Sequence, residues 1–189
     1  MDLTAADIAY VRAGFAPLDE LSHERGDDPA AVRALVARGL LPQPSYVLPD
    51  GTEMVPRDYF ALADEAGGAE ALPAAFAGRC AAAGLDAAEE WDGYLSGVYG
   101  VCLRAVTPET IAAKGRLMDT IAGLVDAPAP EDPEWRAALR AAVDELDALE
   151  RQFAPDYDRS DRFPLPPSRD RLVRAVRERF ADVWTTARL

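Results

Sequence analysis

Residues 18–62 read LDELSHERGDDPAAVRALVARGLLPQPSYVLPDGTEMVPRDYFAL, and this stretch decides the expected fold. Apolar residues recur at helical spacing on both sides of a turn at Gly26-Asp27, where Asp28 can cap a helix that begins at Pro29. Asp50-Gly51 then separates two short runs of β-formers, which is a strong hairpin signal. The order predicts two helices joined by a turn, a hairpin wing and a further helix.

Acidic residues dominate this stretch, as they do the whole chain, whose net charge is −13. Eight acids stand against four arginines between residues 17 and 62, and the hairpin tip is acidic. A surface that binds phosphates needs the opposite sign. The charge therefore disfavours DNA as a partner. It leaves a protein partner or a second copy of the chain as the expected contact of this module.

The remaining composition indicates a cytoplasmic protein without a metal or cofactor. No apolar run approaches a membrane span of roughly 18 residues, and the N-terminus lacks the basic and apolar segments of a signal peptide. Cys80, Cys102 and His23 are the only cysteines and histidine, too few for a structural zinc site. Both cysteines are expected to be small buried apolar side chains. No phosphate loop or dinucleotide-binding motif occurs.

The chain beyond residue 70 has helical periodicity throughout, so the predicted fold class is mainly α with one β-hairpin. The composition changes near Gly67-Gly68. We therefore expect a winged-helix-like module at residues 1–67 and an α-helical domain at residues 68–189, although the two parts could also share one core. Within the helical part, Thr107 is expected to cap one helix and Ser168 the last one.

The segment EEWDGYLSGVYGVCLR (residues 89–104) lies within a helix predicted over residues 87–106. Its three glycines cost roughly 1 kcal/mol each in a helix, which indicates close approach of another backbone or of a ligand. A carboxylate, a phenol and a guanidinium on one face could protonate or bind a polar substrate. The catalytic candidates are Glu90, Tyr94 and Arg104, with Trp91 and Tyr99 as binding candidates. The alternative is tight helix packing with the tyrosines in the core.

Two further groups are candidates for binding. Lys114 is the only lysine of the chain; a buried lysine can act as a base or a nucleophile, whereas a solvated side chain is the ordinary alternative. Asp158, Arg159 and Arg162 belong to a long loop with aromatic neighbours. Such loops often bind ligands, but these charges could equally clamp the loop to itself.

Residues 18–62 resemble the DNA-binding domain of MerR-type regulators. The residues that carry the resemblance are Gly39-Leu40-Leu41-Pro42, the Asp50-Gly51 hairpin and Arg57-Asp58-Tyr59-Phe60. The family usually has GVS..TLR before its second helix, whereas this chain has GDDPAAVR at residues 26–33. The resemblance implies a transcription regulator with a helical ligand-sensing domain, a role that the acidic charge opposes.

A second resemblance covers most of the chain. LSHERG, YLSGVYGVCLRAVTPETIAAKGRLMDTI and FAPDYDRSDRFPLPP are similar to segments of an uncharacterised bacterial family labelled natural product biosynthesis proteins. That resemblance implies a role in specialised metabolism, with a small-molecule pathway intermediate as partner. We expect either a small cofactor-independent enzyme with acid–base groups in its helical domain or a protein that binds an intermediate. The sequence leaves open whether the chain is catalytic.

Overall fold

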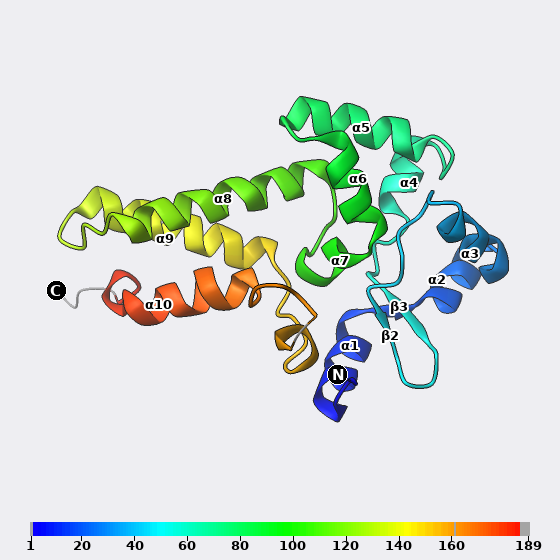
Figure 1. Cartoon of the computed structure of the whole chain (residues 1–189), viewed down its shortest axis with the longest axis horizontal. Coiled ribbons are helices and arrows are strands. Elements are labelled where there is room, and N and C mark those ends of the chain that lie inside the picture. Colours follow the sequence, from blue (N-terminus) through cyan, green and yellow to red (C-terminus); the bar gives the residue numbers. More distant parts are fainter. Residues whose placement is uncertain (1, 161, 186–189) are drawn as a thin grey trace.

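The computed structural model describes residues 2–160 and 162–185, and it is mainly α-helical, as predicted (Figure 1). The elements in the N-terminal half are α1 (Ala5–Gly14), β1 (Ala16–Pro17), α2 (Leu18–Arg25), α3 (Pro29–Ala37), β2 (Tyr46–Val47), β3 (Glu53–Val55), α4 (Ala61–Ala66) and α5 (Leu72–Ala83). Those that follow are α6 (Ala87–Leu95), α7 (Val98–Cys102), α8 (Pro108–Asp126), α9 (Pro133–Leu149) and α10 (Ala175–Arg179).

The small antiparallel sheet has the strand order β1-β3-β2. The expected helix, turn, helix and hairpin follow one another in the chain, and the Asp28 carboxylate caps α3 by accepting from the Ala30 N–H at 3.0 Å. The sequence did not reveal β1, which precedes α2 and pairs Ala16 with Val55 of the hairpin. The likeness of this arrangement to a winged helix-turn-helix stays a prediction.

The hydrophobic core does not divide at Gly67-Gly68, so the expected boundary is corrected. One cluster of buried side chains joins both sides of that position and includes Leu62 and Phe76. Gly67 does end α4 in a left-handed conformation, but a helix end is not a domain end when the flanking helices bury the same apolar surface. A second cluster lies farther along the chain, where α9 packs on the distal half of α8 and on the C-terminal helical segment. These elements form the arm on the left of Figure 1.

The predicted continuous helix over residues 87–106 is wrong. Helix α6 ends at Leu95, Gly97 takes a left-handed φ of 75°, and α7 begins at Val98. The break fits the surroundings, because a Cβ on Gly97 would overlap the Gln43 carbonyl oxygen, and one on Gly100 would lie 2.5 Å from Ser45 Oγ. Gly97 and Gly100 therefore permit close approach of residues 43–45. The sequence suggested such an approach of another backbone as one explanation for its glycines, with a ligand as the other.

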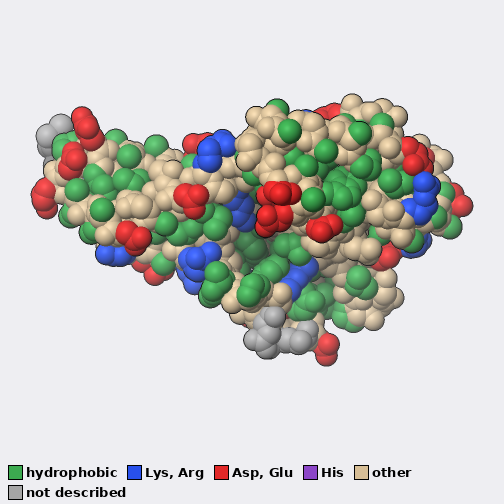
Figure 2. Space-filling model, turned by 45° about the horizontal axis from the view of Figure 1, so that its top comes forward, with side chains coloured by type: hydrophobic (Ala, Val, Ile, Leu, Met, Phe, Trp, Pro, Cys, Tyr) green, Lys and Arg blue, Asp and Glu red, His purple; other side chains and the backbone are tan. Residues whose placement is uncertain are grey.

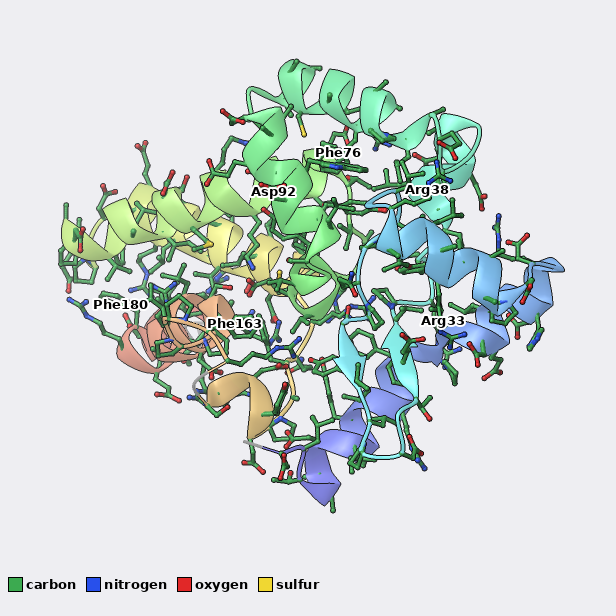
Figure 3. The ribbon with its side chains drawn as sticks, turned by 45° about the vertical axis from the view of Figure 1, so that its right-hand side comes forward. Arg33, Arg38, Phe76, Asp92, Phe163 and Phe180 are labelled. Carbon is green, nitrogen blue, oxygen red and sulfur yellow. The ribbon has the colours of Figure 1, made fainter. Side chains whose placement is uncertain are left out.

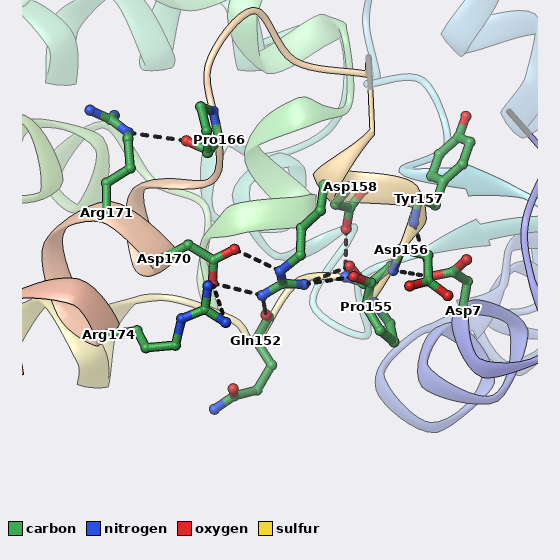
Figure 4. Close-up of polar contacts among 12 residues, drawn as sticks. Asp7, Gln152, Pro155, Asp156, Tyr157, Asp158, Pro166, Asp170, Arg171 and Arg174 are labelled. Carbon is green, nitrogen blue, oxygen red and sulfur yellow. Dashed lines mark hydrogen bonds and ion pairs between the residues drawn. The ribbon is translucent and has the colours of Figure 1, made fainter. Parts of the chain in front are cut away.

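Asp7 ties helix α1 to the segment after α9. Its carboxylate accepts from the Asp156 N–H at 2.9 Å and the Tyr157 N–H at 3.1 Å, and it also completes the Thr4 capping box (Figure 4). Burial raises the pKa of Asp7, but these hydrogen bonds outweigh burial and the net pKa is lowered.

Asp7→Asn is expected to lower the free energy of unfolding by about 1.5–3 kcal/mol at pH 7, the usual contribution of hydrogen bonds to a charged group. Because the folded-state pKa of Asp7 is lowered, its contribution is present above the unfolded pKa of about 3.9 and is lost as the pH falls through the folded value. Denaturant unfolding of both proteins from pH 7 to pH 2.5 measures this. A difference that stays constant below about pH 4 would contradict the assignment.

Candidate functional site

The three catalytic candidates of residues 87–106 do not converge. Tyr94 is buried, whereas Arg104 is exposed beyond the end of α7. Glu90 instead accepts a short hydrogen bond from the Tyr99 hydroxyl across the break between α6 and α7. Burial comes first among the causes that raise the Tyr99 pKa, and the Glu90 carboxylate adds to it, so this phenol is held protonated. The expected shared face of Glu90, Tyr94 and Arg104 is therefore corrected, because it required one unbroken helix.

The aromatic side chains of α6 are core residues. The ring centroids of Trp91 and Tyr94 are 5.3 Å apart, and each lies 5.2 Å from the Phe76 ring on α5. The Tyr94 hydroxyl has no hydrogen-bond partner among the described residues and lines a cavity of about 30 Å³. A cavity of that size has room for ordered water beside this hydroxyl.

The charged loop after α9 is a clamp. Asp158 is 1% exposed and accepts from the Tyr46 hydroxyl at 2.5 Å, the Ala154 N–H at 2.6 Å and Arg162 at 2.6 Å. Arg159 forms a forked pair with Asp170, donating to its two carboxylate oxygens at 2.6 Å and 2.9 Å. The charged side chains of this loop therefore bind other charged side chains and backbone groups of the same chain. This is the clamp that the sequence suggested as the alternative to a ligand-binding loop.

Lys114 is not a solvated side chain. Its Nζ lies 3.0 Å from Oε1 of Glu150, whose side chain is fully buried, and the Lys114 side chain itself is only 17% exposed. The same Oε1 accepts from the Ser168 hydroxyl, while Oε2 has no partner in the described part of the chain. Ser168 therefore does not cap the last helix as expected, because its hydroxyl is directed to Glu150. The Cys102 thiol donates to the Tyr99 carbonyl oxygen at 3.6 Å and lines the same pocket as Lys114 and Ser168.

The backbone fixes these side chains relative to one another. Leu103 and Glu150 form an isolated antiparallel bridge, with the Arg151 N–H donating to the Cys102 carbonyl at 2.9 Å. Lys114 comes from α8, which packs beside α9. Four separate segments of the chain thus place an amine, a carboxylate, a thiol and a hydroxyl close together, called here the Lys114 cluster (Cys102, Lys114, Glu150 and Ser168).

The electrostatics of the cluster keep both the amine and the thiol protonated. Burial lowers the Lys114 pKa, but its contacts with Cys102 and Glu150 outweigh burial and the net pKa is raised. Burial raises the Cys102 pKa, and the nearby ammonium only partly opposes this. At neutral pH the cluster therefore offers an ammonium group and a thiol in surroundings of low polarity.

The cluster opens into an apolar pocket of about 220 Å³. Cys102, Lys114 and Ser168 contribute to its lining, together with Arg171 at the exposed side. The apolar lining comes from Val98, Met118, Phe153, Phe163, Pro164, Leu165, Pro166 and Pro167. Figure 2 shows a hollow between the α8–α9 arm and the rest of the molecule, with hydrophobic side chains inside it. An apolar hollow with a few convergent polar groups is the usual form of a small-molecule site.

Sequence reasoning identified only Lys114 of this cluster. Cys102 was expected to be an inert buried side chain and Ser168 a helix cap, and Glu150 was not singled out. The uniqueness of the lysine was the one signal in the sequence, because Cys102, Glu150 and Ser168 lie far apart along the chain and no local pattern joins them.

Four arginines within residues 1–67 are paired with carboxylates, namely Arg12, Arg25, Arg33 and Arg38. Arg33 on α3 contacts Asp19 at 2.5 Å and Glu53 at 2.7 Å, and the neighbouring Arg38 contacts Glu70 at 2.8 Å (Figure 3). A guanidinium that already binds a carboxylate must release it before it can bind a phosphate. The pairing therefore adds to the charge argument against DNA as a partner.

Within the described ranges, no helix combines the length and apolar character of a membrane span, and His, Cys, Asp and Glu side chains form no group suited to a metal ion.

Comparison with known proteins gives one family. No curated protein matches the chain, and no solved structure matches it. A family model matches residues 77–181, which is more than half of the chain and holds the whole Lys114 cluster. The chain belongs to the family of unknown function DUF6058.

Proposed function

We propose that this protein acts in specialised metabolism by binding an apolar pathway intermediate in the pocket between α7, α8 and residues 163–168. The observation that carries this proposal is the Lys114 cluster at the base of that pocket. The Lys114–Glu150 pair, like the Asp158–Arg162 pair, contains a fully buried carboxylate, but its cation also lines an apolar hollow. The biosynthetic role itself rests on the family resemblance of the sequence.

The cost of the cluster supports a role beyond packing. Removing two charges from water is expensive, and an apolar pair of similar volume is often as stable. Here one carboxylate oxygen is left without a partner among the described residues, so the pair is not fully compensated. A ligand that enters the pocket meets the Lys114 ammonium group, which can donate hydrogen bonds. The Glu150 carboxylate, which can act as a base, lies behind it. These groups can orient a carbonyl and exchange a proton with it.

Replacement of the chromosomal gene by the double variant Lys114→Met/Glu150→Gln tests the function. The variant removes both charges together, so it avoids stranding either one, and it keeps the volume of the side chains. We expect one pathway intermediate to accumulate in the metabolite profile, as it does in a strain without the gene, while transcripts of neighbouring genes remain unchanged.

Arg116→Met provides the matched control. Arg116 lies on the same helix, is exposed, and does not line the pocket. The control should give the parental profile. A parental profile from the double variant, or a change in neighbouring transcripts in place of an accumulated intermediate, would reject the proposed function. The second of these results would favour a transcription regulator.

A further inference from the structure

We infer that the ligand of the pocket between α7, α8 and residues 163–168 is an apolar monocarboxylic acid, bound as its anion. The inference deepens the proposed function and rests on it, since it names the chemical class of the intermediate. Among the residues that line the pocket, Lys114 and Arg171 are the charged ones, and both are cations. The charge of the lining therefore points to a ligand of the opposite sign.

A lining without an acid distinguishes this pocket within the described part of the chain. Aspartates and glutamates outnumber lysines and arginines by 33 to 20 in the sequence. Two other hollows combine both signs of charge, one lined by Arg12 and Glu20 and the other by Arg136 and Asp144. The pocket beside the Lys114 cluster is thus electropositive against the overall charge of the protein, which favours an anion over a neutral or cationic ligand.

The two cations of the lining have hydrogen-bond donors to spare. A lysine side chain carries three donors and an arginine side chain five, and neither has an acceptor. The Lys114 ammonium contacts one carboxylate oxygen of Glu150 at 3.0 Å. The Arg171 Nε donates to the Pro166 carbonyl oxygen at 3.1 Å (Figure 4), and its two terminal nitrogens contact no carboxylate among the described residues. The polar part of a ligand must therefore be an acceptor.

The charge of these groups fits one carboxylate. Glu150 does not line the pocket, but it lies behind Lys114 and balances the charge of that ammonium. Arg171 has no such counter-charge in the described part of the chain, so one positive charge remains at the exposed side. A carboxylate carries one negative charge and two oxygens that match the fork of a guanidinium. A phosphate monoester carries nearly two negative charges and fits less well.

The rest of the lining requires the rest of the ligand to be apolar. It is formed mainly by Val98 of α7, Met118 of α8, and Phe163, Leu165 and the prolines within residues 163–167. Leu165 is 60% exposed, so an apolar chain that covers it removes hydrophobic surface from water. The carboxylate then lies at Arg171, and the apolar chain lies against these side chains.

Isothermal titration calorimetry of the full chain at pH 7 tests the inference with octanoate, octanamide and octylamine. These probes share eight carbons and carry an anionic, a neutral and a cationic head. We expect octanoate to bind at one site and octanamide to bind about tenfold more weakly, the lower end for hydrogen bonds to charged groups, because Arg171 is exposed. Octylamine should show no saturable binding. Hexanoate should bind about tenfold more weakly than octanoate, because it buries two fewer CH₂ groups.

Arg171→Gln separates the charge from the apolar contacts. We expect this variant to bind octanoate about tenfold more weakly and octanamide as the wild type does. Glutamine keeps an N–H donor that can serve the Pro166 carbonyl. Arg174→Gln is the matched control, because Arg174 belongs to the same helical segment (Arg169–Arg174), is exposed and does not line this pocket. It should bind octanoate with the wild-type affinity.

Equal affinities of the wild type for octanoate and octanamide, no saturable binding of octanoate below its micelle-forming concentration, or an unchanged octanoate affinity in Arg171→Gln would overturn the inference. The comparison of probes on the wild type stands even if a variant fails to fold. The proposed function is judged separately, because a parental metabolite profile from the Lys114→Met/Glu150→Gln strain rejects it whatever the charge of the ligand. The two failures are therefore distinguishable.

Discussion

Gly97→Ala is expected to lower the free energy of unfolding by about 3 kcal/mol. A left-handed residue with a side chain costs roughly 1–2 kcal/mol, and forcing an extra methyl into a packed core costs roughly 1–3 kcal/mol more. Both penalties apply here, because Gly97 has a φ of 75° and its Cβ would overlap the Gln43 carbonyl oxygen. Denaturant unfolding followed by circular dichroism measures the change.

Gly115→Ala is the control for this experiment. Gly115 lies within α8, and a Cβ there meets no described atom within 4 Å. Alanine should therefore stabilise the protein by about 0.5–1 kcal/mol through helix propensity alone. If Gly97→Ala also left the stability unchanged or raised it, residues 43–45 would not pack against the α6–α7 break as described.

Lys114→Met is expected to lower the free energy of unfolding by about 3 kcal/mol, the lower end of the range for removing one partner of a buried ion pair. The lower end applies because the Lys114 side chain keeps 17% of its surface exposed, whereas the Glu150 side chain has none. Without the ammonium, the buried carboxylate retains only the hydrogen bond from Ser168. Equilibrium unfolding in urea at pH 7 provides the measurement.

Lys114→Met/Glu150→Gln should recover most of that loss, because an uncharged pair of similar volume leaves no isolated charge. The comparison of single and double variants isolates the pairwise term. If the losses of unfolding free energy in the two single variants added up in the double variant, the two side chains would stabilise the fold independently. That result would contradict a stabilising ion pair between them.

The sequence predicted the elements whose causes are local. Asp28 and Thr107 cap helices as expected, because each cap depends only on the next three residues of the chain. The fold class followed from helical periodicity. The break at Gly97 was missed because its reason, the Gln43 carbonyl, lies more than fifty residues away in the chain.

The candidate site was harder to predict for the same reason. Ser168 follows prolines and precedes an amphipathic run, a pattern typical of a cap, but the buried carboxylate of Glu150 takes its hydrogen bond. Tyr94 and Arg104 could share a face only on an unbroken helix, whereas α6 ends at Leu95. Asp158, Arg159 and Arg162 were correctly grouped by their spacing, yet spacing alone did not distinguish a clamp from a binding loop.

Ligand mapping by NMR tests the central claim, that the pocket beside the Lys114 cluster binds apolar small molecules. The probe is S-hexyl-N-acetylcysteamine, a small molecule that carries a six-carbon apolar chain. We expect saturable amide shifts that are largest in residues 98–102, 114–118 and 163–168. Shifts centred instead on the Tyr94 cavity or on α2 and α3, or shifts that never saturate, would contradict the claim.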